Sequence, residues 1–310
     1  MIDIIQGDIT RIPVDCIVNA ANDLVLIGGG VDGAIHRGGG ALLKEDFLRV
    51  RAQAGGCRVS ESVLTVAGDL PAQYVLHAVG PTWEGGGKEE RMMLYKTYYN
   101  ALVKAQELSC GSISFPNIST GVFRFPKADA ASIAYQAVLD FNFISKRSFE
   151  RVVFVCYDAD NFSLYQSLVN VSSSMSALGR FLVAQEQHFE SALGEIQSGR
   201  KSTHWMWFIF PQLMGLGSSY NSTYYAIKDL EEAKAYLMHP ILGTRLLSIC
   251  EALLKVSGKT ALDIMGSPDD VKLQSCLTLF SQVAGSNSIF DRLLERFFDG
   301  QRCYKSVLTH

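Results

Sequence analysis

Hydrophobic and polar positions alternate in two different ways along the first part of the chain. Short runs rich in β-branched and aromatic residues predict strands, and between them apolar residues recur at helical spacing. The predicted strands are 2–6, 16–20, 62–67, 74–80, 112–118 and 151–157, and the predicted helices are roughly 31–54, 89–109, 127–141 and 160–170. Strands that alternate with helices of this length favour a largely parallel sheet covered on both faces, an α/β fold.

The pattern changes at the serine-rich segment 171–176. Beyond it the chain shows only helical periodicity, and in 177–197 the apolar side chains fall on one helical face. Further helices are predicted at about 229–238, 241–256, 269–284 and 288–298. We therefore expect an α/β domain over 1–172, followed by a separate all-α domain over 177–310.

Composition narrows the class of protein. The 310 residues are 48% hydrophobic and carry a formal charge of −3, so two ordinary cores can form and no general attraction to nucleic acid or to an anionic membrane is expected. The first ten residues lack the basic and apolar parts of a secretory signal, and no apolar run is long enough to cross a bilayer. We expect a soluble cytoplasmic protein, with the nucleus as the alternative in a eukaryote.

The cysteines give no sign of a disulfide framework or of a zinc site. All seven are dispersed, without a Cys-x-x-Cys pair or a histidine at zinc-ligand spacing. Several lie in apolar contexts, as Cys156 and Cys250 do. We expect buried free thiols, no structural zinc or other metal, and no cofactor.

The segment 16–36 holds the densest candidate chemistry. A buried strand ends near Asn22, a glycine run follows at 28–30, and a helix is expected directly after it. Glycine reaches positive φ at little cost and a helix N-terminus carries partial positive charge, so this loop can wrap its N–H groups around a diphosphate. With Gly33 the glycines also match the dinucleotide pattern G-x-G-x-x-G, but residues 22–27 separate them from the strand, which argues against that interpretation.

Asp32 and His36 are four residues apart, so on a helix they share one face, about a turn from the glycines. Each alone has a plain structural explanation, Asp32 as an N-terminal cap and His36 as a packed histidine. Asn19 and Asn22 arrive where the preceding strand ends. The combination with Asn22 shifts the balance towards a ligand site.

Two further turns follow predicted strands. Asp8 comes directly after the first strand, where with Thr10 it is expected to cap the turn. The segment 119–123 follows the strand at 112–118, and its small residues leave backbone N–H groups accessible. In a parallel sheet this loop and the glycine loop both emerge at the carboxyl ends of strands, where ligands bind.

The blocks GDIT (7–10), VDCIVNAAN (14–22), GGGVDGAIHRGGG (28–40), LPAQYVLHAVGP (70–81) and FPNISTGVFRFP (115–126) stand in this order. Together they resemble a macrodomain of the MacroD type over about the first 170 residues. The resemblance implies a three-layer α/β/α sandwich that binds ADP-ribose and hydrolyses it from modified acidic side chains or from O-acetyl-ADP-ribose. It implies catalytic roles for Asn22, Asp32 and His36. The ADP-ribose contacts it implies are Asp8, Ile9, Asn22, Gly28, Gly29, Gly30, Val31, Ser119, Thr120, Gly121, Val122 and Phe123.

In the second domain the aromatic segment 199–217 stands out. Its tryptophans and phenylalanines are expected to be core, yet the polar residues beside them suit a phosphate and a stacked base. The candidates are Arg200, Lys201, His204, Trp205, Gln212 and Lys272. Lys201 and His204 are neighbours if their segment is helical. The alternative is that the lysines are solvated surface charges and the histidine is packed in the core.

Three blocks carry a second resemblance: HWMWFIFPQ (204–212), HPILGTRL (239–246) and DDVKLQSCLTLF (269–280). They resemble an uncharacterised helical family, which we place near the NADAR superfamily of NAD and ADP-ribose chemistry. That resemblance implies recognition of, or action on, ADP-ribosylated nucleobases and related ligands.

Together these patterns predict a two-domain ADP-ribosyl hydrolase. Asn22 would hold the terminal ribose, Asp32 would orient and deprotonate the attacking water, and His36 would position the Asp32 helix. The expected partners are ADP-ribose and ADP-ribosylated protein or nucleobase substrates. Two alternatives stay open: a non-catalytic reader of ADP-ribosylated partners, and a helical half that serves as an interaction scaffold.

Overall fold

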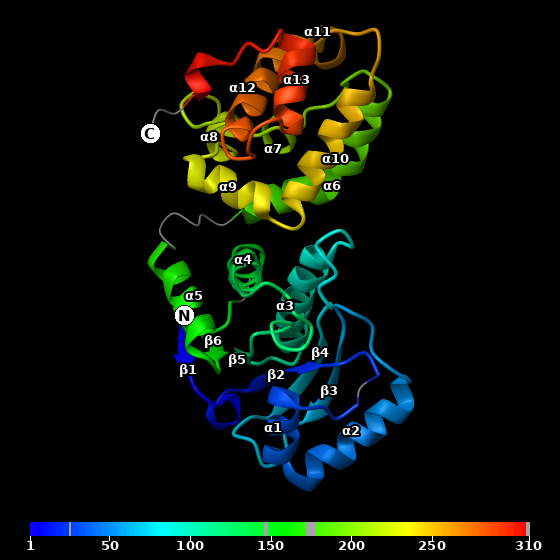
Figure 1. Cartoon of the computed structure of the whole chain (residues 1–310), viewed down its shortest axis with the longest axis vertical. Helices are drawn as coiled ribbons and strands as arrows, with labels where there is room; N and C mark the ends of the chain where they lie inside the picture. Colours follow the sequence, from blue (N-terminus) through cyan, green and yellow to red (C-terminus); the bar gives the residue numbers. More distant parts are fainter. Residues whose placement is uncertain (25, 146–147, 172–177, 308–310) are drawn as a thin grey trace. The chain divides into compact units, whose positions relative to one another are not determined.

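The computed structural model describes residues 1–24, 26–145, 148–171 and 178–307 (Figure 1). The chain divides into two compact units, Met1–Ser172 and Ser173–His310. The segment 172–176, which holds most of the predicted boundary, lies outside the described residues.

The first unit is built on one six-stranded sheet with the order β1-β6-β5-β2-β4-β3. The strands are β1 (Ile2–Gln6), β2 (Cys16–Ala21), β3 (Ser62–Val66), β4 (Tyr74–Val79), β5 (Ser112–Phe115) and β6 (Arg151–Cys156). Neighbouring strands run parallel except β3 and β4, which pair antiparallel. Because helices cover both faces, the central strands are buried on both sides and read as nearly continuous apolar runs.

Two helical layers enclose this sheet. On one side lie α1 (Gly30–Gly38) and α2 (Gly40–Ala54), and on the other lie α3 (Glu90–Glu107), α4 (Lys127–Ile144) and α5 (Ala159–Val171) (Figure 1). A short 3-10 turn, η1 (Ile9–Arg11), follows β1. Between the sheet and the first layer the core includes Ile17, Ile35, Leu43, Phe47 and Val75. The predicted α/β fold is confirmed.

One helix expected from the sequence is two helices in the structure. The periodic pattern over 31–54 is interrupted because Gly40 has a φ of +66° and a Cβ at Gly39 would lie 2.4 Å from the Leu43 side chain. The predicted strand at 112–118 ends at Phe115, since the proline that follows has no N–H for the ladder. The glycine break separates α1 from α2, and the end of α1 packs against the turn between β3 and β4, where the Asp69 N–H donates to the Gly39 carbonyl.

The second unit consists of helices, and its described residues hold no strand beyond a single bridge between Leu213 and Ile227. The longer helices are α6 (Gly179–Gln197), α9 (Leu230–Met238), α10 (Leu242–Lys255), α12 (Asp269–Ser281) and α13 (Ile289–Phe298). The shorter ones are α7 (Met206–Ile209), α8 (Tyr220–Tyr224), α11 (Ala261–Met265) and η2 (Tyr304–Ser306). They share one apolar core that contains Phe181, Trp205, Phe210 and Phe280. The predicted all-α domain is confirmed, whereas the short elements α7, α8, α11 and η2 were not predicted.

None of the described helices is by itself long and apolar enough to cross a membrane. By length and composition α9 and α10 meet that test only as a pair, with a bend of 84° between them.

Candidate functional site

Two loops of the first unit reach the same edge of the sheet. β2 pairs in parallel with both β4 and β5, so the loops that leave β2 and β5 emerge at neighbouring carboxyl ends. The first loop, 22–29, leads into α1, whose N-cap Gly29 makes no side-chain hydrogen bond. The second loop, 116–126, leads into α4. An uncapped helix N-terminus beside a second loop of small residues is an arrangement suited to an anion.

Asp32 fastens the first loop to its helix. Its buried carboxylate accepts a hydrogen bond from the Asn19 amide at Oδ1 and one from the Gly28 N–H at Oδ2, with a donor–acceptor distance of 2.5 Å in each case. His36 lies one turn along α1, with Nε2 3.5 Å from Oδ1 of Asp32. A Cβ at Gly33 would fall 2.9 Å from the Gly28 carbonyl oxygen, so glycine at this position lets the loop close onto α1. Gly33 therefore serves the packing of this loop and not a dinucleotide turn.

Asp32 keeps its negative charge in spite of its burial. Burial by itself raises the pKa of a carboxyl, but the interactions with His36, Asn19 and the Gly28 N–H outweigh it and leave the pKa of Asp32 below its usual value. The side chain is therefore ionised at neutral pH, and it can act as an acceptor towards a water molecule or a hydroxyl group.

Two residues that the sequence analysis did not select as ligand contacts complete this cluster. Asn19 on β2 and His77 on β4 are direct neighbours in the strand register, and both are fully buried. The Asn19 amide nitrogen lies 2.5 Å from Asp32 Oδ1 and 3.0 Å from His77 Nδ1, and His77 Nε2 lies 2.9 Å from Thr65 Oγ1. The signal available in the sequence was their position, because an asparagine or a histidine inside an apolar strand must find a buried hydrogen-bond partner.

His36 is held by ring packing. Its ring meets Phe47 edge-on at 4.4 Å and stacks on His77 at 5.5 Å between ring centroids. Within the described part of the chain neither of its ring nitrogens has a hydrogen-bond partner. This packing is compatible with the predicted role of His36 in positioning α1, and that role stays a prediction.

Asp32, His36 and His77 each offer one ligand atom, and these atoms lie within 4.8 Å of one another. The set nevertheless suits a metal ion poorly. Both His77 nitrogens already have hydrogen-bond partners, and the Asn19 amide nitrogen, a donor, stands between Asp32 and His77.

Among the described residues no hydrogen bond joins the side chain of Asn22 to Asp32. The Asn22 side chain closes the loop on itself, because Nδ2 donates to the Leu26 carbonyl at 2.6 Å and Oδ1 accepts from the Leu26 N–H at 3.0 Å. Of the predicted catalytic trio, Asp32 and His36 are direct neighbours, and the side-chain amide bonded to Asp32 is that of Asn19. The catalytic role of Asn22 stays a prediction. The predicted glycine contacts Gly28, Gly29 and Gly30 are exposed, and Val31 is half-buried.

The second loop is held in a strained conformation at both ends. Ser119 and Arg124 have φ values of +66° and +56°, which residues with side chains adopt at a cost, and such strain is common at ligand sites. The loop is closed by hydrogen bonds from Arg124 N–H to the Gly121 carbonyl and from Phe125 N–H to the Ser119 carbonyl, at 2.9 and 3.0 Å. Val122 is 90% exposed at its tip.

The predicted contacts in this loop differ in exposure. Gly121 and Val122 are exposed, Thr120 and Phe123 are half-buried, and Ser119 is buried. Among the described residues the N–H groups of 121–123 donate to no acceptor, which leaves them open to an anion.

Asp8 caps the turn after β1. Its Oδ1 accepts from the Thr10 N–H at 3.0 Å and from the Thr10 hydroxyl at 2.7 Å, and the hydroxyl in particular lowers the pKa of Asp8. Ile9 begins η1 and is buried. Capping is the role that the sequence itself favours for Asp8, and the adenine contact implied for Asp8 and Ile9 stays a prediction.

In the helical unit Lys201 is held by contacts within the protein. Its Nζ lies 2.7 Å from Asp269 Oδ2 and 5.0 Å from the centre of the Trp205 ring. Lys272 Nζ lies 2.8 Å from the other Asp269 oxygen and 4.7 Å from the Trp207 ring centre. Asp269 thus brings the two lysines together, although the sequence suggested only a helix start at this position.

The segment 200–205 is not helical, so the expectation that Lys201 and His204 are neighbours on one helix turn is wrong. Glu195 at the end of α6 shapes this segment instead. Its carboxylate accepts from two backbone N–H groups at 2.6 and 3.1 Å and from the Trp205 indole at 2.9 Å. Burial opposes the charge, but these hydrogen bonds lower the pKa of Glu195 to about 2.

The remaining predicted residues do not share the contacts of the two lysines. Arg200 and His204 are exposed, and Gln212 is half-buried. Within the described ranges no hydrogen bond or ion pair joins the side chains of these three residues to Lys201 or Lys272.

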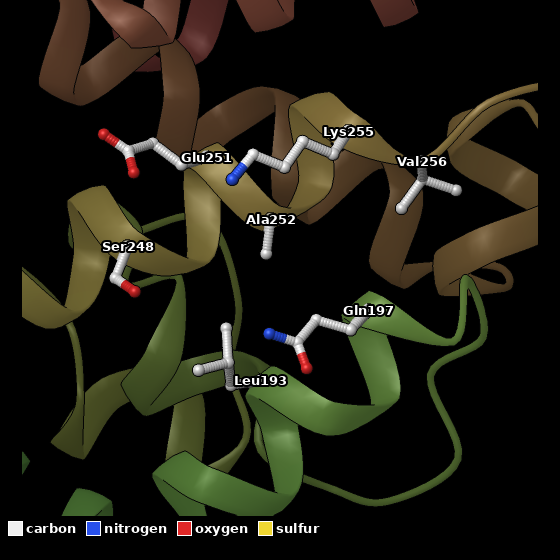
Figure 2. A pocket seen from close by; sticks show the side chains of 7 residues that line it. All are labelled: Leu193, Gln197, Ser248, Glu251, Ala252, Lys255 and Val256. Carbon is white, nitrogen blue, oxygen red and sulfur yellow. The ribbon is translucent and has the colours of Figure 1, made fainter.

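A groove elsewhere in this unit, between α6 and α10, has a volume of about 210 Å³. Figure 2 shows Leu193 and Gln197 of α6 on one side and Ala252 and Lys255 of α10 on the other. None of the residues predicted from the sequence lines this groove, and its walls gather no cluster of reactive groups.

Comparisons with known proteins follow the same division of the chain. A macro domain model matches residues 18–134, and a model described as a protein of unknown function, DUF1810, matches residues 175–309. The macrodomain resemblance is thereby confirmed. The DUF1810 match covers the helical unit, and the relation to the NADAR superfamily stays a prediction.

Curated relatives and solved structures match the first unit. An O-acetyl-ADP-ribose deacetylase of Escherichia coli K12 is 48% identical over 169 residues, which are 54% of this chain and 94% of the relative. A macrodomain of Oceanobacillus iheyensis with ADP is 35% identical with a TM-score of 0.51, covering 55% of this chain and 90% of that one. A Trypanosoma brucei macrodomain in complex with ADP-ribose is 39% identical with a TM-score of 0.50, covering 54% and 68%. Through its first unit, this chain belongs to the macrodomain family.

Proposed function

We propose that residues 1–172 bind ADP-ribose and hydrolyse esters of its terminal ribose, in O-acetyl-ADP-ribose or on ADP-ribosylated Asp and Glu side chains. The observation that carries this proposal is the ionised Asp32, held between Asn19 and the Gly28 N–H at the uncapped N-terminus of α1. The relative from Escherichia coli is named an O-acetyl-ADP-ribose deacetylase, and the two solved macrodomains hold ADP or ADP-ribose, which supports the same ligand here.

Hydrolysis of such an ester needs a water molecule placed against the acyl carbon. The water oxygen bonds to that carbon, the bond from the carbon to the ribose oxygen breaks, and a proton from the water ends on the ribose oxygen. The products are a carboxylic acid and ADP-ribose. A carboxylate that accepts a hydrogen bond from the water holds this molecule in place. Its negative charge also offsets the positive charge that develops on the water during the attack, and Asp32 is suited to this role.

The other predicted residues support binding. The N–H groups at the start of α1 and those of 121–123 offset the charge of the diphosphate. Asn22 reaches the terminal ribose if its bonds to Leu26 open, and His36 keeps α1 packed against Phe47.

The test uses the full chain with O-acetyl-ADP-ribose and a peptide ADP-ribosylated on glutamate. Release of ADP-ribose from either substrate supports the proposal, provided that Asp32→Ala releases at least about tenfold less. Binding of ADP-ribose without turnover of any ester would overturn the hydrolase and leave the non-catalytic reader. One observation favours that second candidate: both Asp32 oxygens already accept from protein donors.

For the helical unit we propose recognition of ADP-ribose-containing ligands at Trp207 and Lys272. The Lys272 ammonium group lies over the ring of the half-buried Trp207, and the Lys272 side chain is 25% exposed, so an aromatic ring and a charge lie together near the surface. The full chain with Lys272→Met should bind an ADP-ribosylated guanine nucleotide more weakly than the unmodified chain. The control is Lys234→Met on the surface of α9, which should leave this binding unchanged. Equal binding by the two variants would leave this unit as an interaction scaffold.

A further inference from the structure

We propose that Asn19 is a positioning residue that fixes Oδ1 of Asp32, and that the ring of His77 holds the Asn19 amide in the orientation this requires. The kinetic part of this inference rests on the proposed hydrolysis, whereas its titration part does not. The sequence predicted neither residue as part of the site, and it favoured Asn22 as the catalytic asparagine.

The geometry places one amide group between two acceptors. The Asn19 nitrogen donates to Asp32 Oδ1 at 2.5 Å and to His77 Nδ1 at 3.0 Å, which uses both of its hydrogens. Asn19 and His77 are paired residue by residue across β2 and β4, so the two strands hold the amide and the ring at a fixed spacing. Both side chains are 0% exposed, and water does not compete for these bonds.

Only one orientation of the Asn19 amide fits this site. If the amide were turned round, its oxygen would face the Asp32 carboxylate oxygen and the His77 nitrogen lone pair, and both contacts would be repulsive. In the observed orientation the Asn19 oxygen is buried without a hydrogen-bond partner among the described residues. An unsatisfied buried oxygen costs free energy. The observed orientation therefore leaves the Asn19 oxygen unpaired but keeps the hydrogen bond from the Asn19 nitrogen to Asp32.

His77 is an acceptor towards Asn19 because its ring is neutral. Burial, followed by the nearby His36, lowers the pKa of His77 to about 3. The proton of the neutral ring sits on Nε2 and is donated to Thr65 Oγ1 at 2.9 Å, which leaves Nδ1 free to accept. Thr65, His77, Asn19 and Asp32 thus form a chain of hydrogen bonds that runs from β3 through β4 and β2 to α1.

The two Asp32 oxygens then have separate functions. Asn19 fixes Oδ1 and stabilises the charge, whereas the Gly28 N–H on Oδ2 holds the glycine loop. Loss of Asn19 leaves the bond to Gly28 in place. We therefore expect loss of Asn19 to change the charge and the orientation of Asp32 before it changes the affinity for ADP-ribose.

The test compares the full chain with Asn19→Ala and Asn19→Asp. Asn19→Asp keeps the side-chain shape but removes the donor, so it separates the hydrogen bond from the packing even if Asn19→Ala fails to fold. The charged and titratable groups facing this site are His36 on α1 and His77 on β4, and Asp46 on α2 acts on His77. A ¹³C NMR titration of the Asp32 carboxyl carbon should show its midpoint at higher pH in Asn19→Ala, and at still higher pH in Asn19→Asp, where two carboxyl groups share a proton.

Kinetics give the second measurement. On O-acetyl-ADP-ribose, kcat should fall on the order of tenfold in Asn19→Ala, while the Kd for free ADP-ribose stays within about twofold. The control is Asn100→Ala, which removes a single exposed hydrogen bond to the Ser60 carbonyl at 2.9 Å in the same unit and should alter neither quantity.

Two results would overturn the inference. One is an Asp32 titration that is the same in all variants, and the other is an equal loss of kcat and affinity, which would mark Asn19 as purely structural. If the unmodified chain binds ADP-ribose but turns over no ester, the hydrolase proposal fails, and the Asp32 titration still decides the role of Asn19.

Discussion

Replacing Asp32 with asparagine tests how the glycine loop is held. The change keeps the shape of the side chain and exchanges one acceptor oxygen for an NH₂ donor. In the native protein Oδ1 faces the Asn19 amide nitrogen and Oδ2 faces the Gly28 nitrogen, each at 2.5 Å. As long as Asn19 keeps its orientation, one donor will face another donor at that separation whichever way the new amide turns, so one of the two contacts must open.

The size of the effect follows from the bond that is lost. A hydrogen bond to a charged group is worth about 1.5–3 kcal/mol, and the buried donors left unpaired add to the loss. For a domain of this size each kcal/mol lowers the melting temperature by roughly 2–4 °C, so the transition of the first unit should move down by roughly 3–12 °C. If the bond to Gly28 is the one that opens, the loop also loses its anchor, and ADP-ribose affinity should fall about tenfold, equivalent to about 1.4 kcal/mol.

Differential scanning calorimetry of the full chain measures the first quantity, and titration calorimetry with ADP-ribose measures the second. Asp160→Asn is the matched control, because Asp160 is 82% exposed and its surface ion pair with Lys127 should contribute almost nothing. An Asp32→Asn protein that melts and binds like this control would refute the claim that Asp32 ties the loop to α1.

Three further predictions concern stability. Lys201→Met should lower the stability of the helical unit to urea by about 1–3 kcal/mol, because the native side chain is 8% exposed in its ion pair, whereas Lys228→Met, from a side chain 50% exposed, should change it by less than about 0.5 kcal/mol. Gly68→Ala should lower the melting temperature of the first unit, since Gly68 has a φ of +63° and a Cβ there would lie 1.9 Å from a carbonyl oxygen. The pKa of His77 falls from 6.5 to about 3 on folding, so between these pH values the unfolded chain binds one proton more than the folded chain. Urea unfolding should therefore show a first unit that is most stable above pH 6.5 and loses stability as the pH falls towards 3. In His77→Phe the free energy of unfolding should depend less steeply on pH.

The fold could be predicted because the strands and helices of the first unit have different periods. Buried parallel strands show as unbroken apolar runs, and the helices between them show their own spacing. The break between α1 and α2 could not be seen this way, since Gly39 and Gly40 lie in a pattern that stays periodic on both sides. Whether a glycine interrupts a helix depends on the tertiary contacts it makes, such as the approach of Leu43 to Gly39.

The site was predicted in part for a related reason. Asp32 and His36 were found because helical spacing places them on one face, and the structure does bring them together. Asn19 was missed because its partners come from other elements, His77 on β4 and Asp32 on α1. The sequence of one strand does not show which residues of the neighbouring strands pair with it. Asn22 looked equally suitable, but its own loop satisfies its side chain through Leu26.

The helical unit shows why residue type is a weak guide to a binding site. A lysine has three N–H donors, and in Lys201 they meet Asp269, the Thr203 carbonyl and the Trp205 ring, so a phosphate would have to displace Asp269 first. In the part of the chain that the structure describes, Lys272 bonds only to Asp269, and its side chain is more exposed than that of Lys201. A ligand here would therefore meet one accessible ammonium group whose charge Asp269 already offsets. Stacking on Trp207, more than attraction to a phosphate, would have to supply most of its affinity.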